Sequence, residues 1–251
     1  PKSLEKWSES EKEKIEYYKM LQYFFFKQWR ALKEYANEKG IYIIGDIPIY
    51  VSADSADLWT NPKQFYVDKD IKPIDVAGCP PDAFTADGQL WGNPVYNWEY
   101  HKKTKYEWWK NRIGHCFKIY DVIRIDHFRG FDEFYCIPFG SENAKKGEWR
   151  KGPGLDLFKA LKNEFGELPI IAEDLGFLTD SVRSLLRDVG YPGMKVLQFA
   201  FNPEEESDYI PHTYIKNTIV YTGTHDNDTI LGWSTSANPA EVEYAKEYLR
   251  A

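Results

Sequence analysis

The residues whose types and spacing could do chemistry begin with Arg124 and Asp126. They close the run 121–126, where β-branched residues predict a short buried strand. Side chains alternate along a strand, so Arg124 and Asp126 should point to the same face. The guanidinium should lower the pKa of Asp126 and keep it ionised, as a nucleophile requires. An ordinary ion pair at a strand end explains the same spacing.

Carboxylates also follow other apolar runs of the sequence. The remaining strands are predicted at residues 41–51, 168–174, 194–201 and 218–228. Of these, 41–51 carries Asp46 inside it, 168–174 carries Glu173 near its end, and 218–228 carries Asp226 near its end. Parallel strands joined by helices bring their carboxyl ends to one side of a sheet. Asp126, Glu173 and Asp226 should therefore converge.

Helices are expected between these strands. Their predicted ranges are residues 5–39, 99–116, 155–165, 180–189 and from 238 onward. Thr179 is the expected N-cap of the fourth helix, and Gly190 should end it. The aromatic residues of the first helix recur at helical spacing and are interpreted as a core contact.

Two segments have no sustained period and are predicted to be irregular. Residues 131–154 form the shorter one. Residues 52–98 are rich in Asp, Gly, Pro and aromatic residues, and we expect them to form an insertion beside the site that acts as a lid or platform. An ordered surface loop that covers the strands is the alternative for this insertion.

Composition narrows the class of protein. The 251 residues have 43% hydrophobic content, enough for one or two domains, and a net charge of −7 that argues against a nucleic-acid partner. No apolar run has the length of a membrane span, and there is no signal-like segment. Three cysteines, Cys79, Cys116 and Cys136, predict thiols in a reducing cytoplasm. The histidines show no zinc spacing, so we expect no metal and no cofactor.

The spacing of the strands suggests a piece of a larger parallel α/β fold. A barrel averages about 30 residues per strand-helix unit. Asp126 to Glu173 then fits one unit with an inserted loop, and Glu173 to Asp226 fits two ordinary units. Only five strands are counted, so the sequence does not encode a closed eight-stranded barrel, and we interpret the chain as an internal piece of a longer protein.

Five motifs, in order, carry a resemblance to a known family. They lie at residues 45–51 with 54–59, 88–94, 124–130, 172–176 and 223–229. The sequence resembles the 4-α-glucanotransferases, also called amylomaltases or disproportionating enzymes, a branch of the α-amylase superfamily. The resemblance covers nearly the whole chain. It implies a partial (β/α)8 barrel holding about the third to seventh strands, with residues 1–251 forming a catalytic segment and residues 52–98 a loop insertion after the first of these strands.

The resemblance also implies roles for particular residues. Asp126 would be the nucleophile, Glu173 the acid/base, and Asp226 the carboxylate that stabilises the transition state. The remaining residues would bind substrate: Arg124, His225, Gln89, Trp91, Asp82, Phe84 and Asn227. The charge of Asp226 should raise the pKa of Glu173 and keep it protonated for its first step.

Neighbouring polar residues have simpler explanations. His127 could brace the strand end or touch substrate, and Asp174 should point away from Glu173 into a structural hydrogen bond. Asp46 and Asp54 lie in family-like motifs, but turn or helix capping explains each equally well.

We therefore expect a cytoplasmic transferase that moves α-1,4-glucan segments between maltooligosaccharides by a retaining double displacement. One alternative is an α-amylase-type hydrolase, in which water attacks instead of a sugar. Another is a glucan-binding segment that is inactive without the rest of the barrel. A carboxylate-lined divalent-metal site is disfavoured by the Arg124 partner and by the absence of closely spaced acids. The sequence does not indicate an oligomeric state.

Overall fold

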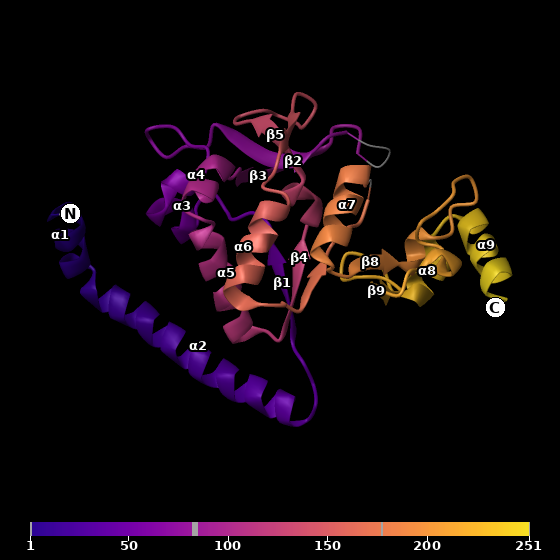
Figure 1. Ribbon diagram of the computed structural model, residues 1–251, viewed down its shortest axis with the longest axis horizontal. Coiled ribbons are helices and arrows are strands. Elements are labelled where there is room, and N and C mark those ends of the chain that lie inside the picture. The colour runs from indigo at the N-terminus through magenta and orange to yellow at the C-terminus, as the bar shows by residue number, and fades with distance from the viewer. Residues whose placement is uncertain (1, 82–84, 177, 251) are drawn as a thin grey trace.

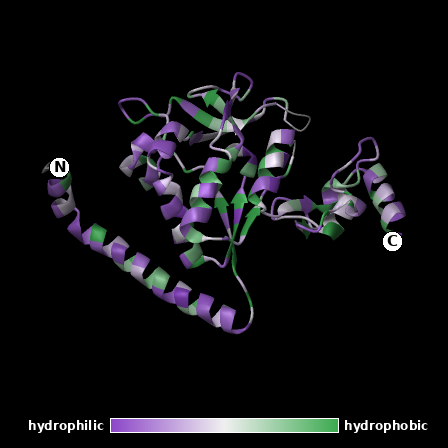
Figure 2. Cartoon of the chain, viewed as in Figure 1, coloured by the Kyte–Doolittle hydropathy of each residue, from purple (hydrophilic) through white to green (hydrophobic). Residues whose placement is uncertain are grey.

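Parallel strands form the centre of the computed structural model, which describes residues 2–81, 85–176 and 178–250 (Figure 1). They hydrogen-bond in the order β1-β4-β7, with β8-β9 as a separate pair. In the described ranges the parallel strands are β1 (Ile44–Pro48), β4 (Val122–Asp126), β7 (Ile170–Ala172), β8 (Gly193–Val196) and β9 (Thr218–Tyr221). The central strands are coloured largely hydrophobic in Figure 2, and each parallel strand lies in or beside a predicted run. The predicted parallel α/β arrangement is confirmed.

The Asp174 side chain joins the two groups of strands. At the end of β7, the amide of Ala172 donates to the Pro192 carbonyl at 2.9 Å. The amide of Met194 donates to Oδ1 of Asp174 at 2.6 Å, and Asp174 is only 6% exposed. Gly193 leaves room for this carboxylate, because a Cβ there would lie 2.5 Å from Asp174 Oδ2. The structural hydrogen bond expected of Asp174 is confirmed.

Helices follow the strands and pack against one another beside them. They are α4 (Trp98–Lys103), α5 (Glu107–Ile119), α6 (Leu155–Phe165), α7 (Asp180–Val189), α8 (Ile230–Ser236) and α9 (Pro239–Leu249). The bounds of α6 and α7 agree with the prediction, and Thr179 caps α7 by accepting from the Val182 amide. The single helix predicted at residues 99–116 is wrong. The chain breaks into α4 and α5 because Lys105 and Tyr106 take left-handed φ values of 53° and 58°.

The connection from β8 to β9 also differs from the prediction of an ordinary strand-helix unit. Two short 3-10 helices, η3 (Leu197–Phe199) and η4 (Pro211–Thr213), and irregular chain occupy it. A small cluster around Phe201, Ile210 and Ala245 packs this connection against α9. This connection is therefore stabilised by packing against α9, and it does not need to form a long helix of its own.

Both segments predicted to be irregular contribute to one antiparallel sheet. Its strands pair in the order β3-β2-β5-β6, where β2 is Asp75–Cys79, β3 is Gln89–Pro94, β5 is Glu133–Pro138 and β6 is Glu148–Lys151. The longer segment also contains α3 (Ala56–Thr60) and η1 (Pro62–Gln64), and η2 (Phe128–Phe131) leads into the shorter one. The expectation of irregular chain is wrong here, because the pairing of β2 with β5 joins distant parts of the sequence.

The N-terminal helices α1 (Lys2–Ser10) and α2 (Lys12–Glu38) project from the body (Figure 1). The core contact predicted for the aromatic face of α2 is wrong, since no residue of α2 is buried and Tyr17 and Tyr35 are 54% and 61% exposed. The helix attaches through one edge of this face, since Trp29, a member of the predicted aromatic stripe, contacts the body. Trp29 Nε1 donates to the Ile119 carbonyl at 2.8 Å, and the Lys33 ammonium lies 3.2 Å from Asp121 Oδ1. Periodicity identified the stripe but not which face of the helix the body would cover.

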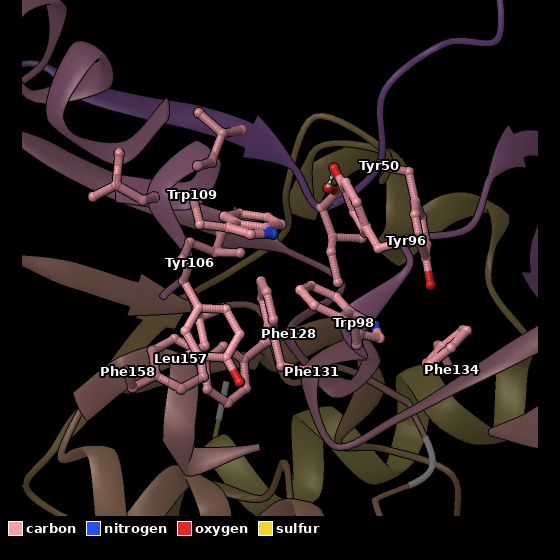
Figure 3. Close-up of a cluster of buried hydrophobic side chains, with 14 of the residues drawn as sticks. Tyr50, Tyr96, Trp98, Tyr106, Trp109, Phe128, Phe131, Phe134, Leu157 and Phe158 are labelled. Carbon is pink, nitrogen blue, oxygen red and sulfur yellow. Dashed lines mark hydrogen bonds between the residues drawn. The ribbon is translucent and has the colours of Figure 1, made fainter. Parts of the chain in front are cut away.

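Aromatic side chains fill the space between the helices and the ends of the parallel strands (Figure 3). The largest fully buried side chains include Trp109 of α5, Tyr96, and Phe128 and Phe131 of η2. Burial of each such ring contributes about 2–3 kcal/mol to the free energy of folding. Because η2 begins two residues after Asp126, this core fixes the chain that follows β4.

Arg112 of α5 anchors the carboxyl end of β1. Its guanidinium donates to the carbonyls of Pro48 at 2.5 Å and Ile49 at 2.9 Å, and to the Tyr96 hydroxyl at 3.1 Å. It also lies over the Trp109 ring at 5.1 Å. These contacts give β1 a fixed end, although it is an edge strand of its sheet.

We predict that Arg112→Met lowers the free energy of unfolding by about 2–4 kcal/mol, because two carbonyl groups and a phenol lose a charged donor. Urea denaturation of both proteins measures the difference. Arg187→Met is the matched control on the exposed side of α7 and should cost less than about 0.5 kcal/mol. Equal effects of the two substitutions would show that Arg112 does not anchor β1.

Candidate active site

Arg124 lies between two carboxylates at the end of the parallel strands. Its Nη2 lies 3.2 Å from Oδ1 of Asp126, and its Nη1 forms a short ion pair with Asp46. The register explains the second contact, because β1 and β4 pair Asp46 with Arg124. Nε of Arg124 also donates to the Met194 sulfur at 3.3 Å. Ile123, on the opposite face of β4, is fully buried, so the predicted alternation is confirmed.

The pKa of Asp126 departs from the prediction. Burial raises it above the ordinary aspartate value, and this effect outweighs the lowering by Arg124. The charges of Asp46 and Asp226 raise it further. The predicted net lowering is therefore wrong, because the guanidinium is shared with a second carboxylate and the Asp126 carboxyl has lost part of its water.

Glu173 follows β7 and accepts one backbone hydrogen bond on each carboxyl oxygen. The His127 amide donates to Oε2 at 2.7 Å, and the Leu175 amide donates to Oε1 at 2.9 Å. Burial raises the pKa of Glu173 to about 7, although both amides oppose the shift. The predicted direction is confirmed, but the cause is burial, with Asp126 as the acid that adds to it. The carboxyl groups of Asp126 and Glu173 thus lie in different environments, one beside a guanidinium and the other between two backbone amides.

His225, Asp226 and Asn227 lie in the turn after β9. His225 Nε2 is 3.3 Å from Asp226 Oδ1, and both side chains are more than 70% exposed. Both residues are close enough to shift the pKa of Asp126, in opposite directions. The Asn227 side chain instead accepts from the amide and hydroxyl of Thr224, both at 2.9 Å, which shapes the turn. The structure thus brings Asp226 toward Asp126 and uses Asn227 within the loop.

Gln89 and Trp91 reach the site from β3. Trp91 Nε1 donates to Gln89 Oε1 at 3.0 Å. The Trp91 ring meets the His127 ring with centroids 4.7 Å apart and planes at 88°. Trp91 therefore contacts the residue that directly follows Asp126 in the chain. Asp82 and Phe84, predicted to bind substrate, lie outside the described residues.

Sequence reasoning did not assign Asp46 or His127 to the site. An acid inside the otherwise apolar run 41–51, one strand away from Arg124, is the signal that could have identified Asp46. The capping role considered for Asp54 is not observed, because Ser55 caps α3. His127 braces the strand end through its backbone amide, one of the two roles considered for it.

The arrangement offers two carboxyl groups with different duties. Asp126 has a guanidinium within ion-pairing distance, which favours its ionised form. Glu173 has a pKa near neutrality, so it can give up and take back a proton. Such a pair suits nucleophilic attack by one group and acid/base chemistry by the other. Within the described residues, no group of three or more His, Cys, Asp or Glu side chains could hold a metal ion, and no helix is long and apolar enough to cross a membrane.

Comparisons with known proteins give a consistent result. A family model described as 4-alpha-glucanotransferase (Glyco_hydro_77) matches residues 1–251. The chain is 50% identical over 249 residues to the 4-alpha-glucanotransferase of Clostridium butyricum, and 54% identical over 247 residues to that of Streptococcus pneumoniae strain TIGR4. Each match covers 98% of this chain but 51% and 49% of the relative, so the chain spans about half the length of these curated relatives.

A solved structure is also similar. It is the amylomaltase from Streptococcus agalactiae in complex with acarbose, with a TM-score of 0.96 and 48% identity. The match covers 100% of this chain and 51% of that one. The α/β fold described above therefore resembles about half of that amylomaltase.

The raised pKa of Glu173 predicts a pH-dependent stability. A carboxyl group whose pKa is higher when folded stabilises the fold fully below the unfolded pKa, and this contribution is lost as pH rises through the folded value. Glu173→Gln removes the titration. The stability of wild type relative to this variant should therefore fall by about 3 kcal/mol between pH 4.5 and 8.

Urea denaturation at several pH values measures this difference. Glu204→Gln, at an exposed position, is the control and should show little pH-dependent change. A difference between wild type and Glu173→Gln that stays constant across the range would contradict the assigned pKa.

Proposed function

The chain belongs to the 4-alpha-glucanotransferase family, and from that premise we propose that it carries the catalytic residues of an enzyme that transfers α-1,4-glucan segments between maltooligosaccharides. The observation that carries the proposal is the pair Asp126 and Glu173. These carboxyl groups end neighbouring parallel strands, one beside a guanidinium and the other half-buried with a pKa of about 7. A retaining reaction requires this division between a nucleophile and an acid/base.

The proposed architecture is a closed (β/α)8 barrel of which this chain supplies about the third to seventh strands. Residues 1–251 are then a catalytic segment, and residues 52–98 an insertion beside the active site. Two observations support this. β1 is an edge strand of the parallel row, and the similar S. agalactiae chain is about twice as long. Barrel closure would place further strands beside such an edge.

The first step of the proposed reaction forms a covalent intermediate. Glu173 gives its proton to the glycosidic oxygen while Asp126 attacks the anomeric carbon, so the bond to the leaving sugar breaks as a bond to Asp126 Oδ forms. Arg124 holds the nucleophile in place through its 3.2 Å contact. Asp226 and His225 are proposed to bind the hydroxyl groups of the distorted sugar, because they lie in an exposed turn close to Asp126.

The second step regenerates the enzyme. Glu173, now ionised, takes the proton of an acceptor hydroxyl, and the acceptor oxygen displaces Asp126 from the anomeric carbon. Transfer exceeds hydrolysis only if a sugar is held there before water arrives. We assign acceptor binding to Gln89 and Trp91, whose indole offers an apolar face. Asp82, Phe84 and Asn227 remain proposals from family resemblance.

The proposed substrates are maltooligosaccharides and longer α-1,4-glucans, without a nucleic acid, membrane or cofactor. The similar S. agalactiae enzyme was solved with acarbose, which supports a carbohydrate in this site.

We propose the cytoplasm as the location, because free thiols suit a reducing compartment. Cys116 and Cys136 are buried thiols, and burial raises the pKa of Cys136 to about 12, which makes it unreactive.

The function is tested by incubating the full-length protein with maltotriose and separating the products by size. We expect glucose together with maltopentaose and longer products. A rise in the number of reducing ends, without any product longer than maltotriose, would identify a hydrolase instead.

The residue assignment is tested in the same assay. Asp126→Asn and Glu173→Gln should each lower turnover by at least about 10³-fold, because one removes the nucleophile and the other the proton donor. Asp188→Asn, on the exposed side of α7, is the control and should keep wild-type turnover. Near-wild-type rates in either site variant, with an unchanged unfolding midpoint, would remove that residue from the mechanism.

A further inference from the structure

His127 connects the end of β4 to η2 in an unusual backbone conformation. Its φ and ψ are 54° and 51°, in the left-handed region. Residues with a side chain rarely adopt this region, and they do so mainly where the surroundings enforce it. Here the enforcement comes from both sides, since Asp126 ends a paired strand and Phe128 is fully buried.

The backbone amides of His127 and Phe128 both donate hydrogen bonds to Glu173. The His127 amide donates to Glu173 Oε2 at 2.7 Å, and the next amide, of Phe128, donates to the Glu173 carbonyl at 3.0 Å. Two successive amides thus bind the side chain and the main chain of one residue. This arrangement fixes the position of the Glu173 carboxyl relative to the His127 backbone.

The side chain of His127 supports Trp91. The two rings meet edge to face with centroids 4.7 Å apart, a favourable aromatic geometry. Burial lowers the pKa of His127 to about 4, so the ring is neutral at pH 7 and packs as an uncharged aromatic group. Gly130 leaves space for it, because a Cβ there would lie 3.2 Å from His127 Cδ2 and 2.8 Å from Ile49 Cδ1.

We propose that His127 is a positioning residue that sets the place of the Trp91 indole relative to the Glu173 carboxyl. Its amide holds one group and its ring the other, so a single residue links the acid/base to the acceptor platform. This inference rests on the proposed function, in which Glu173 activates an acceptor that Trp91 binds. Correct placement of both groups favours attack by a sugar hydroxyl over attack by water.

The proposal assigns one role to the backbone amide of His127 and another to its ring, and a substitution can remove the ring alone. Asn tolerates the left-handed region and keeps the backbone amide but lacks the ring. His127→Asn should therefore preserve the Glu173 hydrogen bond and release Trp91. We expect donor cleavage within about 3-fold of wild type, while the ratio of transfer to hydrolysis falls about 3- to 10-fold and the KM for a glucose acceptor rises.

A double-mutant cycle with Trp91→Phe tests whether His127 acts through Trp91. Full-length wild type, His127→Asn, Trp91→Phe and the double variant are given maltotriose, and free reducing ends and longer products are counted separately. If the proposal holds, the double variant has the same transfer-to-hydrolysis ratio as Trp91→Phe. Lys105→Asn, at an exposed position with φ 53°, is the backbone-matched control and should behave as wild type.

Three results would overturn the proposal: an unchanged ratio in His127→Asn, effects that multiply in the double variant, or donor cleavage that falls together with transfer. His127→Gly, which also keeps the amide and suits positive φ, replaces His127→Asn if that variant does not fold. Failure of the proposed function is distinguished by the wild type, which would then make no product longer than maltotriose.

Discussion

The guanidinium of Arg124, held between Asp46 and Asp126, is the interaction on which the site depends. One positive charge compensates two carboxylates, and the Arg124 side chain is only 13% exposed, so losing either partner would leave charge poorly solvated. The three residues meet only if β1 and β4 keep their register, because a shift of one residue would turn Arg124 to the opposite face. Parallel pairing and active-site electrostatics are therefore one constraint in this fold.

Around this ion pair, burial assigns different properties to two acids of similar chemistry. Asp126 keeps a cation beside it, whereas Glu173 is held by two backbone amides in a largely apolar setting that brings its pKa to about 7. The buried Phe128 and Phe131 of η2 belong to the aromatic core and fix the chain that follows Asp126. The chemistry thus arises from how each strand end is packed and not from the residue types alone.

Local signals predicted what depends on local structure. The Thr179 cap and the Gly190 stop gave the bounds of α7, and apolar runs located the parallel strands with their terminal acids. Predictions failed where distant segments decide the outcome. The β3-β2-β5-β6 sheet pairs residues that no local pattern connects, and the aromatic stripe of α2 gave no information on which face would be covered. The predicted lowering of the Asp126 pKa is wrong for the same reason, because the burial of this carboxyl and the approach of Asp46 both arise only in the fold.

The central claim is that Asp126 forms a covalent bond to the sugar while Glu173 acts first as the general acid and then as the general base. It is tested most directly by treating full-length Glu173→Gln with α-maltotriosyl fluoride. Fluoride leaves without a proton donor, and the second step lacks its base, so a glycosyl-enzyme should accumulate. Peptide mapping by mass spectrometry should then find one maltotriosyl group on Asp126. A sugar attached to Asp226 or Asp46, or fluoride release with no adduct on the protein, would contradict this account.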